Sequence, residues 1–464
     1  MTRVHSDRLA IPNGDGCETE ATEDDLRTWI ESVFKTVVTT WTQISGGNRC
    51  RSWVIGLKDN KDGPNEVYLR YQPPRAPSAE PYTVWREAQI YSAIEATNVC
   101  APRLLAVHSE HQAIVTTVAE GQAEFRRLND DAQKTAIVKE FVHSLVNLHA
   151  CPIGQLSMGL LKTPADIAQC VRDEIEIWRA MYQETDSQDA LIELALNWLS
   201  ANMPEPEEAP VLVHGDAGPG NFLFKGNHMT GLVDWELAHP GDPIEDLAWF
   251  CMRSVMEPVP DFAAALREYE VASGRKIDQF RLLYHRVFVS TRVVIIRHRN
   301  VTGLPGNSIV SRSLNRRLLI DALAAAEGVQ LLPHDPIEPV TTERSIFYDE
   351  IIEDLKGLSE KQQPDVKNFA KNTAKVIKFL RQYDSIGREV EARTRKSIGA
   401  LLGHEITDLK TAHQQFAKAV KANQIGTIPA LQTFSALVAM DAQIAAPSSG
   451  RMATRGFPPI TQED

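Results

Sequence analysis

The most constraining feature of this sequence is a short polar loop between two apolar segments near the middle of the chain. Residues 211–213 are apolar and lead into an H-G-D tripeptide that ends at Asp216, and Asn221 follows in the same loop. A second acidic residue, Asp234, ends the next short apolar run. A phosphoryl group in transfer carries spread negative charge, so its catalysis depends on positioning and electrostatics. In such a reaction one carboxylate can orient the acceptor hydroxyl, and an amide and a second carboxylate can bind Mg²⁺. The loop therefore predicts phosphoryl transfer.

Each part of this pattern also has a purely structural interpretation. An isolated H-G-D tripeptide occurs in turns, and an aspartate at the end of a strand often only caps it. The spacing favours catalysis, because a tight turn after Asp216 returns Asn221 beside it and a hairpin returns Asp234 to the same cleft. Three glycines in the loop permit so tight a turn.

On these residues the sequence resembles the aminoglycoside phosphotransferase and choline kinase-like superfamily, whose H-G-D-x-x-x-x-N loop and following acidic strand replace the H-R-D and D-F-G elements of protein kinases. The resemblance covers residues 22 to about 327 and implies an α+β, protein kinase-like fold with a small β-rich N-lobe and a larger helical C-lobe. It implies ATP and Mg²⁺ as cofactors, Asp216 as the catalytic residue, and Asn221 and Asp234 as metal ligands. His214 takes the position that packs and orients the catalytic loop, and Glu236 is expected to support the loop or the substrate.

A helix start follows this segment. Asp242 as N-cap, Pro243 at the first helical position and Glu245 at the third make an ordinary helix N-terminus. For Asp242 we expect only this structural role. The resemblance implies that Asp246 points back to brace the catalytic loop.

The nucleotide site is expected in the strand-rich first part of the chain. Short β-branched or aromatic segments lie near 38–45, 51–58, 66–71, 103–108 and 112–118, with one helix at about 82–97. Gly46 and Gly47 lie between the first two strands, where backbone N–H groups can approach phosphates. Two adjacent glycines fit a hairpin turn equally well, and the full G-x-G-x-x-G pattern is missing.

A kinase of this type normally pairs a lysine on the third strand with a glutamate on the next helix to hold the α and β phosphates. Here the third strand carries Arg70, and the following helix carries Glu87. Arginine can grip phosphate with two nitrogens, so the role is feasible with a different geometry. A surface arginine and a solvated glutamate are the alternative. The strand that contains Val115 and Thr117 is expected to form the hinge whose backbone meets the adenine.

The acceptor is less constrained than the donor. Arg70 with its Y-L-R-Y-Q-P-P segment and the D-W-E strand resemble one branch of the superfamily, the kinase domains associated with acyl-CoA dehydrogenases, which act on hydroxyacyl-CoA. We therefore favour a hydroxyacyl-CoA, or another small hydroxylated metabolite, as the substrate. A phosphotransferase for aminoglycosides or amino alcohols, a nucleotide-binding pseudokinase and a structural adaptor are the alternatives.

An arginine-rich segment between two predicted helices bears on the same question. Because apolar residues lie beside these arginines, the segment could bind the phosphates of CoA. A simpler interpretation is that the arginines lie at helix C-termini and on solvated helix faces, where cationic side chains are common. Its arginines are Arg286, Arg292, Arg297, Arg299, Arg312, Arg316 and Arg317.

These signals predict a modular chain with a kinase part and a helical appendage. The predicted parts are a flexible tail (1–21), an N-lobe that binds nucleotide (22–120), a catalytic and substrate-binding C-lobe (121–328), a proline-rich linker (329–341), a helical accessory domain (342–446) and a second flexible tail (447–464). In the accessory domain Val366, Phe369, Val376, Ile377 and Leu380 share one helical face, and separate helices are expected at 384–402, 407–423 and 429–445. This domain shows no catalytic grouping and is expected to mediate contacts within or between chains.

Composition narrows the range of partners. The chain has 49 basic and 61 acidic residues, a formal charge of −12, which is the wrong sign for nonspecific binding to nucleic acid. The six cysteines are scattered without a C-x-x-C pair, as expected of free thiols in a reducing compartment. The polar, acidic start lacks the pattern of a signal peptide, and no 18-residue apolar run occurs. We therefore expect a cytoplasmic protein without nucleic-acid or membrane partners.

Overall fold

The computed structural model describes residues 9–12, 16–44, 49–58, 63–151, 153–156, 158–159, 161–299, 305–360 and 363–461. The chain forms two compact units. The first comprises residues 1–177, 205–278 and 458–464, and the second comprises residues 178–204 and 279–457. These units divide the chain differently from the predicted lobes, since residues 178–204 and 279–328 of the predicted C-lobe belong with the C-terminal helices.

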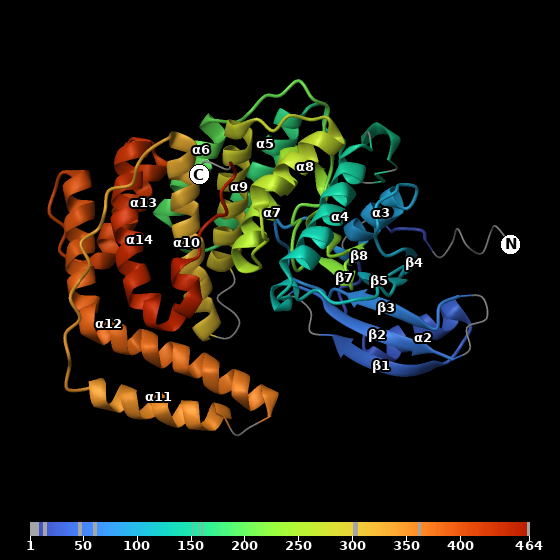
Figure 1. The fold of residues 1–464 in the computed structure, drawn as a ribbon, viewed down its shortest axis with the longest axis horizontal. Helices are drawn as coiled ribbons and strands as arrows, with labels where there is room; N and C mark the ends of the chain where they lie inside the picture. The colour runs from blue at the N-terminus through green and yellow to red at the C-terminus, as the bar shows by residue number, and fades with distance from the viewer. Residues whose placement is uncertain are drawn as a thin grey trace. The chain divides into compact units, whose positions relative to one another are not determined.

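The first unit begins with a five-stranded antiparallel sheet (Figure 1). The strands lie in the order β1-β2-β3-β5-β4, and the predicted strand positions agree closely with the observed ones. Thr22 and Asp25 form a capping box at the start of the first helix. The elements are α2 (Glu23–Phe34), β1 (Val38–Ile44), β2 (Arg51–Leu57), β3 (Glu66–Tyr71), α3 (Val84–Ile94), β4 (Leu104–Val107) and β5 (Ala113–Thr117).

The alternation of side chains along β3 separates a core face from the face that carries Arg70. Val67 and Leu69 are fully buried and belong to one hydrophobic cluster with Leu26 and Ile30 of α2. Because successive strand residues point to opposite faces, Arg70 lies on the other face of the sheet.

The rest of the first unit is mainly helical and encloses short hairpins. Strand β6 pairs with β9, and β7 pairs with β8, so the polar loop between β6 and β7 is held from both sides. Asp242 caps α7 and Pro243 stands in its first turn, as predicted. The elements are η1 (Phe125–Arg127), α4 (Asp131–His149), η2 (Ile153–Gln155), α5 (Ile167–Gln183), β6 (Val211–Val213), β7 (Phe222–Lys225), β8 (His228–Leu232), η3 (Trp235–Leu237), β9 (His239–Gly241), α7 (Pro243–Met256) and α8 (Phe262–Ser273). The residues of α5 from 178 onward belong to the second unit.

The described residues of the second unit form helices and connecting segments, without a strand. Its elements are α6 (Ala190–Ala201), α9 (Gln279–Arg299), α10 (Pro305–Glu327), α11 (Ser345–Glu360), α12 (Pro364–Leu402), α13 (Leu409–Lys421), α14 (Thr427–Ser449) and η4 (Gly450–Thr454). The expected helix boundary near residue 384 is wrong, because α12 continues through it. A glycine inside a helix costs only about 1 kcal/mol. Burial of Ile386 and Val390 on either side of Gly387 offsets that cost.

The segment 329–342 has no helix or strand, in agreement with its predicted lack of helical pattern, but it is bonded to α14. Gln432 donates to the carbonyl of Gln330 and accepts from the N–H of Leu332, both at 2.9 Å. Gln443 makes the same double contact with Ile337. Three helical turns separate the two glutamines, so α14 holds an extended segment by its backbone.

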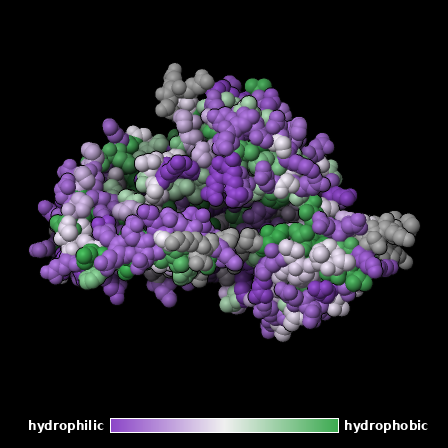
Figure 2. Space-filling view, turned by 60° about the horizontal axis from the view of Figure 1, so that its bottom comes forward, coloured by the Kyte–Doolittle hydropathy of each residue, from purple (hydrophilic) through white to green (hydrophobic). Residues whose placement is uncertain are grey.

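Most of the surface seen in Figure 2 is hydrophilic, with hydrophobic residues scattered or in small groups. Among the helices of the described residues, none is both long enough and apolar enough to cross a membrane. All six cysteines are free thiols.

Candidate active site

The carboxylate of Asp246, in the first turn of α7, anchors the start of the polar loop. It is fully buried, and its Oδ2 and Oδ1 accept the backbone N–H groups of His214 at 2.8 Å and Gly215 at 2.9 Å. Nε2 of His149, from α4, lies 3.0 Å from Oδ2. One carboxylate therefore ties the loop to two helices.

Backbone geometry makes glycine necessary at the second position of the loop. Gly215 has φ +75°, and an added Cβ would collide with the carbonyl oxygen of Leu237. Both conditions exclude an ordinary side chain. His214 is buried, with Nε2 2.9 Å from the carbonyl oxygen of Val233 and its ring 4.6 Å from that of Trp235.

Asp216 is held by two neighbours. Nε of Arg253, from α7, donates to Oδ1 at 2.7 Å, and Nη2 of the same guanidinium binds Oδ2. Nδ2 of Asn221 donates to Oδ2 and to the backbone carbonyl of Asp216, both at 2.9 Å. The tight turn thus brings Asn221 back to Asp216, and Arg253 adds a bidentate ion pair that restricts the carboxylate further.

Asp234 lies just beyond the strand that is bonded to the loop. The N–H of Val233 donates to the carbonyl of Asn221 at 2.9 Å, which keeps the next residue near the loop. Asp234 has φ +67°, in the left-handed region that few residues other than glycine adopt. Such conformations persist only where the surroundings enforce them, and they cluster at functional sites.

Arg70 joins the sheet to this loop. Its Nε lies 3.1 Å from a carboxylate oxygen of Glu87, and its Nη1 donates to Oδ1 of Asp234 at 3.0 Å. Its Nη2 binds Glu236, which also accepts from Arg49 at 3.2 Å. The structure therefore brings Arg70, Glu87, Asp234 and Glu236 together in one network.

Burial and the surrounding charges affect these carboxyl groups differently. Burial raises the pKa of Glu87 to about 7, although Arg70 opposes the shift. Burial, together with repulsion from Asp234, also raises the pKa of Glu236. Burial would raise the pKa of Asp234 as well, but Arg70 and Arg253 outweigh it and lower that pKa. Asp234 is therefore kept as the anion, the form that binds cations.

The donor set near Asp234 fits a hard divalent cation. Asp234 is ionised and its side chain is 37% exposed. Its Oδ1 accepts from Arg70, and among the described residues no hydrogen bond is formed to Oδ2. The amide nitrogen of Asn221 is turned to Asp216, which leaves its carbonyl oxygen available. Mg²⁺ prefers one or two carboxylates or carbonyl oxygens and completes its shell with water and phosphate.

The other predicted nucleotide contacts are the glycine pair and strand β5, which pairs directly with the strand of Arg70. Gly46 and Gly47 lie outside the described residues. Val115 is fully buried in β5, and the N–H of Thr117 donates to the carbonyl of Arg103 at 2.9 Å. The backbone of this strand is thus largely engaged within the sheet.

The sequence analysis missed three residues of this site. Arg253 lies two helical turns after Asp246, on the same face of α7, so helical spacing from the predicted brace was an available signal. The position of His149 after Leu148 indicates only a histidine at the edge of the core, and Arg49 follows the glycine pair without any motif. Their partners are distant in sequence, so only the fold shows their roles.

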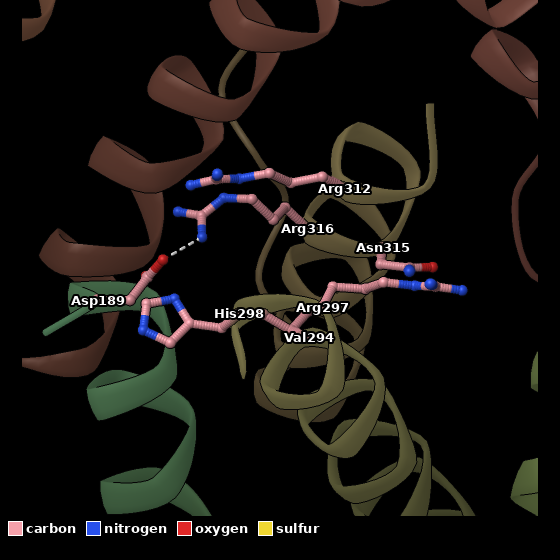
Figure 3. A pocket seen from close by; sticks show the side chains of 7 residues that line it. All are labelled: Asp189, Val294, Arg297, His298, Arg312, Asn315 and Arg316. Carbon is pink, nitrogen blue, oxygen red and sulfur yellow. Dashed lines mark hydrogen bonds and ion pairs between the residues drawn. The ribbon is translucent and has the colours of Figure 1, made fainter. Parts of the chain in front are cut away.

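The arginine-rich segment lies in the second unit, and most of its side chains are engaged there. In Figure 3, Arg312 and Arg316 extend side by side toward Asp189, whereas Arg297 points away beside Asn315. The engaged pairs are Arg316 with Asp189, Arg299 with Glu184, Arg317 with the carbonyl oxygens of Met452 and Arg455, Arg286 with the ring of Phe457, and Arg292 with the ring of Phe288.

Neither sequence interpretation of this segment fits its structure well. Arg286 and Arg292 are buried rather than solvated, so the simpler interpretation is wrong for them. Their guanidiniums lie 4.2 and 4.1 Å from ring centroids, a packing role that desolvated arginine fills well. Few cations of the segment are thereby left for a CoA phosphate.

Comparison with known proteins places this geometry among phosphotransferases. A model of the phosphotransferase enzyme family matches residues 40–281. Acyl-CoA dehydrogenase family member 11 of Rattus norvegicus is 28% identical over 198 residues, which are 40% of this chain and 25% of that protein. Acyl-CoA dehydrogenase family member 10 of Mus musculus is 26% identical over 127 residues, 26% of this chain and 11% of that protein. The match thus spans a quarter or less of these relatives.

A solved structure supports the same fold. A candidate aminoglycoside phosphotransferase from Ralstonia eutropha superimposes with a TM-score of 0.53 at 17% identity, covering 67% of this chain and 99% of that one. The likeness confirms the predicted α+β, protein kinase-like fold with additional C-terminal helices.

Proposed function

Because this chain belongs to the phosphotransferase enzyme family, we propose that it transfers the γ-phosphoryl group of ATP to a hydroxyl group of a small molecule. The observation that carries the proposal is the contact of Asp216 with Asn221 on one loop, with Asp234 beside them and kept ionised. We assign Asp216 as the catalytic residue and Asn221 and Asp234 as the metal ligands. Bound Mg²⁺ would neutralise phosphate charge between these two side chains and the nucleotide.

In the proposed reaction the acceptor oxygen forms a bond to the γ-phosphorus, and the bond from that phosphorus to the leaving ADP oxygen breaks. The hydroxyl proton passes to the carboxylate of Asp216. Both oxygens of Asp216 already accept hydrogen bonds from Arg253, which fixes the direction of the carboxylate. Asp216 therefore acts mainly by orienting the hydroxyl, as a loose transition state requires.

On the donor side, we assign Arg70 to the α and β phosphates in place of the usual lysine. The ion pair with Glu87 holds the guanidinium on β3, and its contacts to Asp234 and Glu236 place it beside the proposed metal ligands. Gly46 and Gly47 remain predicted phosphate contacts, and the end of β5 with the residues after it remains the predicted adenine contact.

For the acceptor, we propose a hydroxyacyl-CoA. Two observations support this class: the relatives are named acyl-CoA dehydrogenase family members, and Arg70 replaces lysine as in the kinase domains associated with such dehydrogenases. The arginine-rich segment adds no support, because most of its cations are engaged.

The test measures ADP release from Mg-ATP with panels of hydroxyacyl-CoAs, amino alcohols and aminoglycosides. We expect turnover with a hydroxyacyl-CoA. Asp216→Asn should abolish it while ATP binding, measured by calorimetry, is retained, because Asp216 does not hold the nucleotide. Asp261→Asn, which keeps a helix cap elsewhere in the first unit, is the control.

The outcomes separate the alternatives. Turnover with aminoglycosides or amino alcohols alone would overturn the acceptor assignment but keep the catalytic one. ATP binding without turnover on any acceptor would favour a pseudokinase. Full activity of Asp216→Asn would overturn the assignment of the catalytic residue.

A further inference from the structure

Helix α11 and the first half of α12 form an antiparallel hairpin in the second unit (Figure 1). No residue of α11 is fully buried. Its half-buried residues repeat with steps of three and four and make the contact with α12, which is the principal neighbour of α11. These residues are Ser345, Tyr348, Ile352, Leu355 and Ser359.

Each helix of the hairpin carries a further apolar stripe that the hairpin contact does not cover. The exposed α11 stripe is Phe347, Ile351 and Leu358. The exposed α12 stripe is Val366, Phe369, the half-buried Val376, Leu380 and Tyr383, whose successive steps of three, seven, four and three residues keep them on one face of the helix. The phenylalanines Phe347 and Phe369 are each 61% exposed.

Two ion pairs show that both exposed stripes lie on the same side of the hairpin. Arg344 with Asp384 marks one edge of the contact between the helices, and Asp349 with Arg381, at 3.0 Å, marks the other. At 100° per residue, the exposed α11 stripe adjoins the edge marked by Arg344 and the exposed α12 stripe adjoins the edge marked by Asp384. The two stripes therefore form one apolar face, which we name the hairpin face.

The border of the hairpin face is acidic. Glu350 and Asp354 follow the exposed stripe on the outer side of α11, and Asp365 borders the stripe on α12. Among the described residues these three carboxylates form no ion pair, whereas Asp349 and Glu353 of the same hairpin do. Unpaired charges beside an apolar face complement a partner of opposite charge.

We propose that the hairpin face binds an amphipathic helix of a partner protein, with apolar residues spaced by three and four and with lysine or arginine along its flank. A third helix laid on two antiparallel helices buries both stripes at once. Basic flanking residues would pair with Glu350 and Asp354.

A second copy of this chain fits the hairpin face less well. Three lysines of α12 lie on the opposite side of that helix from its exposed stripe, as the spacing of Lys367, Lys371 and Lys378 shows. If a second copy docked its hairpin face on the first, the acidic border of one copy would meet acidic or neutral residues of the other. Among the described residues, no basic residues would then pair with the acidic border.

The test uses the full chain and a fluorescein-labelled, 18-residue helical peptide with leucines spaced by three and four and lysines on both flanks. A matched peptide with glutamate in place of lysine is the control ligand, and fluorescence anisotropy is the measurement. We expect saturable binding of the lysine peptide alone. Phe369→Ser should weaken it at least tenfold, and Phe280→Ser, at an exposed phenylalanine of α9, should not.

Charge reversal gives an independent measurement. The double variant Glu350→Lys with Asp354→Lys should bind the lysine peptide at least tenfold more weakly and should gain affinity for the glutamate peptide. Absence of saturable binding, or equal binding by the wild type and Phe369→Ser, would overturn the proposal. A concentration-dependent dimer in sedimentation velocity that Phe369→Ser dissociates would overturn it in favour of a second copy.

Discussion

Replacement of Asp246 by asparagine tests how the polar loop that begins at His214 is anchored. The buried carboxylate accepts N–H groups of His214 and Gly215 at 2.8 and 2.9 Å, with Nε2 of His149 at 3.0 Å. Asparagine keeps one acceptor oxygen but turns an NH₂ group toward one of these donors. The NH₂ group and one backbone N–H are then buried without acceptors, at about 1–3 kcal/mol each. We expect the free energy of unfolding to fall by about 2–5 kcal/mol.

The assay is thermal and urea unfolding followed by circular dichroism, with wild type and variant side by side. At about 2–4 °C per kcal/mol for a unit of this size, the melting temperature should fall by roughly 5–20 °C. Asp261→Asn is the control, because its side chain only caps α8 and asparagine caps as well. If Asp246→Asn melted within a degree of the wild type, the carboxylate would not anchor the loop as described.

Three further predictions concern the same unit. Arg253→Lys keeps the positive charge but loses the bidentate contact with Asp216. We therefore expect kcat in the ADP-release assay to fall by about tenfold to a hundredfold, with KM for ATP unchanged. An unchanged kcat would show that Arg253 does not position Asp216. Burial and the neighbouring His111 lower the pKa of His108 to about 4, and its Nδ1 accepts two backbone N–H groups. As pH falls, His108 is therefore protonated in the unfolded chain before it is protonated in the folded protein. Wild type should therefore lose roughly 2 kcal/mol of stability between about pH 6.5 and 4, and His108→Asn, which keeps an acceptor, should lose less in urea unfolding; parallel pH curves would contradict this. Gly215→Ala meets a backbone carbonyl and should cost at least about 3 kcal/mol, whereas Gly226→Ala, with open space around it, should cost about 1 kcal/mol; equal costs would show that the close contact is relieved.

Local signals predicted much of the first unit. The capping box at Thr22, the strand positions and the cap at Asp242 depend on residues within one turn or one strand, so the sequence carries them directly. The contact of Asn221 with Asp216 is also local, because glycines and a short turn leave the chain little freedom. These features were accessible without knowledge of the fold.

Features that balance local preference against packing were predicted less well. A separate helix was expected from residue 384, yet α12 is one continuous helix there, and Ile386 and Val390 are buried along it. The arginines near residue 290 had the pattern of a solvated or phosphate-binding surface, yet Arg286 and Arg292 pack on aromatic rings. Sequence spacing does not show which side of a helix meets another element.

The sequence by itself determined the polar loop at 214–221, the strands that flank it and the family, because these follow from short-range geometry and residue type. Tertiary structure alone decided that Arg253 grips Asp216, that Arg70 binds Asp234 and Glu236 as well as Glu87, and that His149 shares Asp246 with the loop. The partners in each pair are tens of residues or more apart in the chain. Charge and hydrogen-bonding pairs act only over a few ångströms, so their partners are set by how the elements pack.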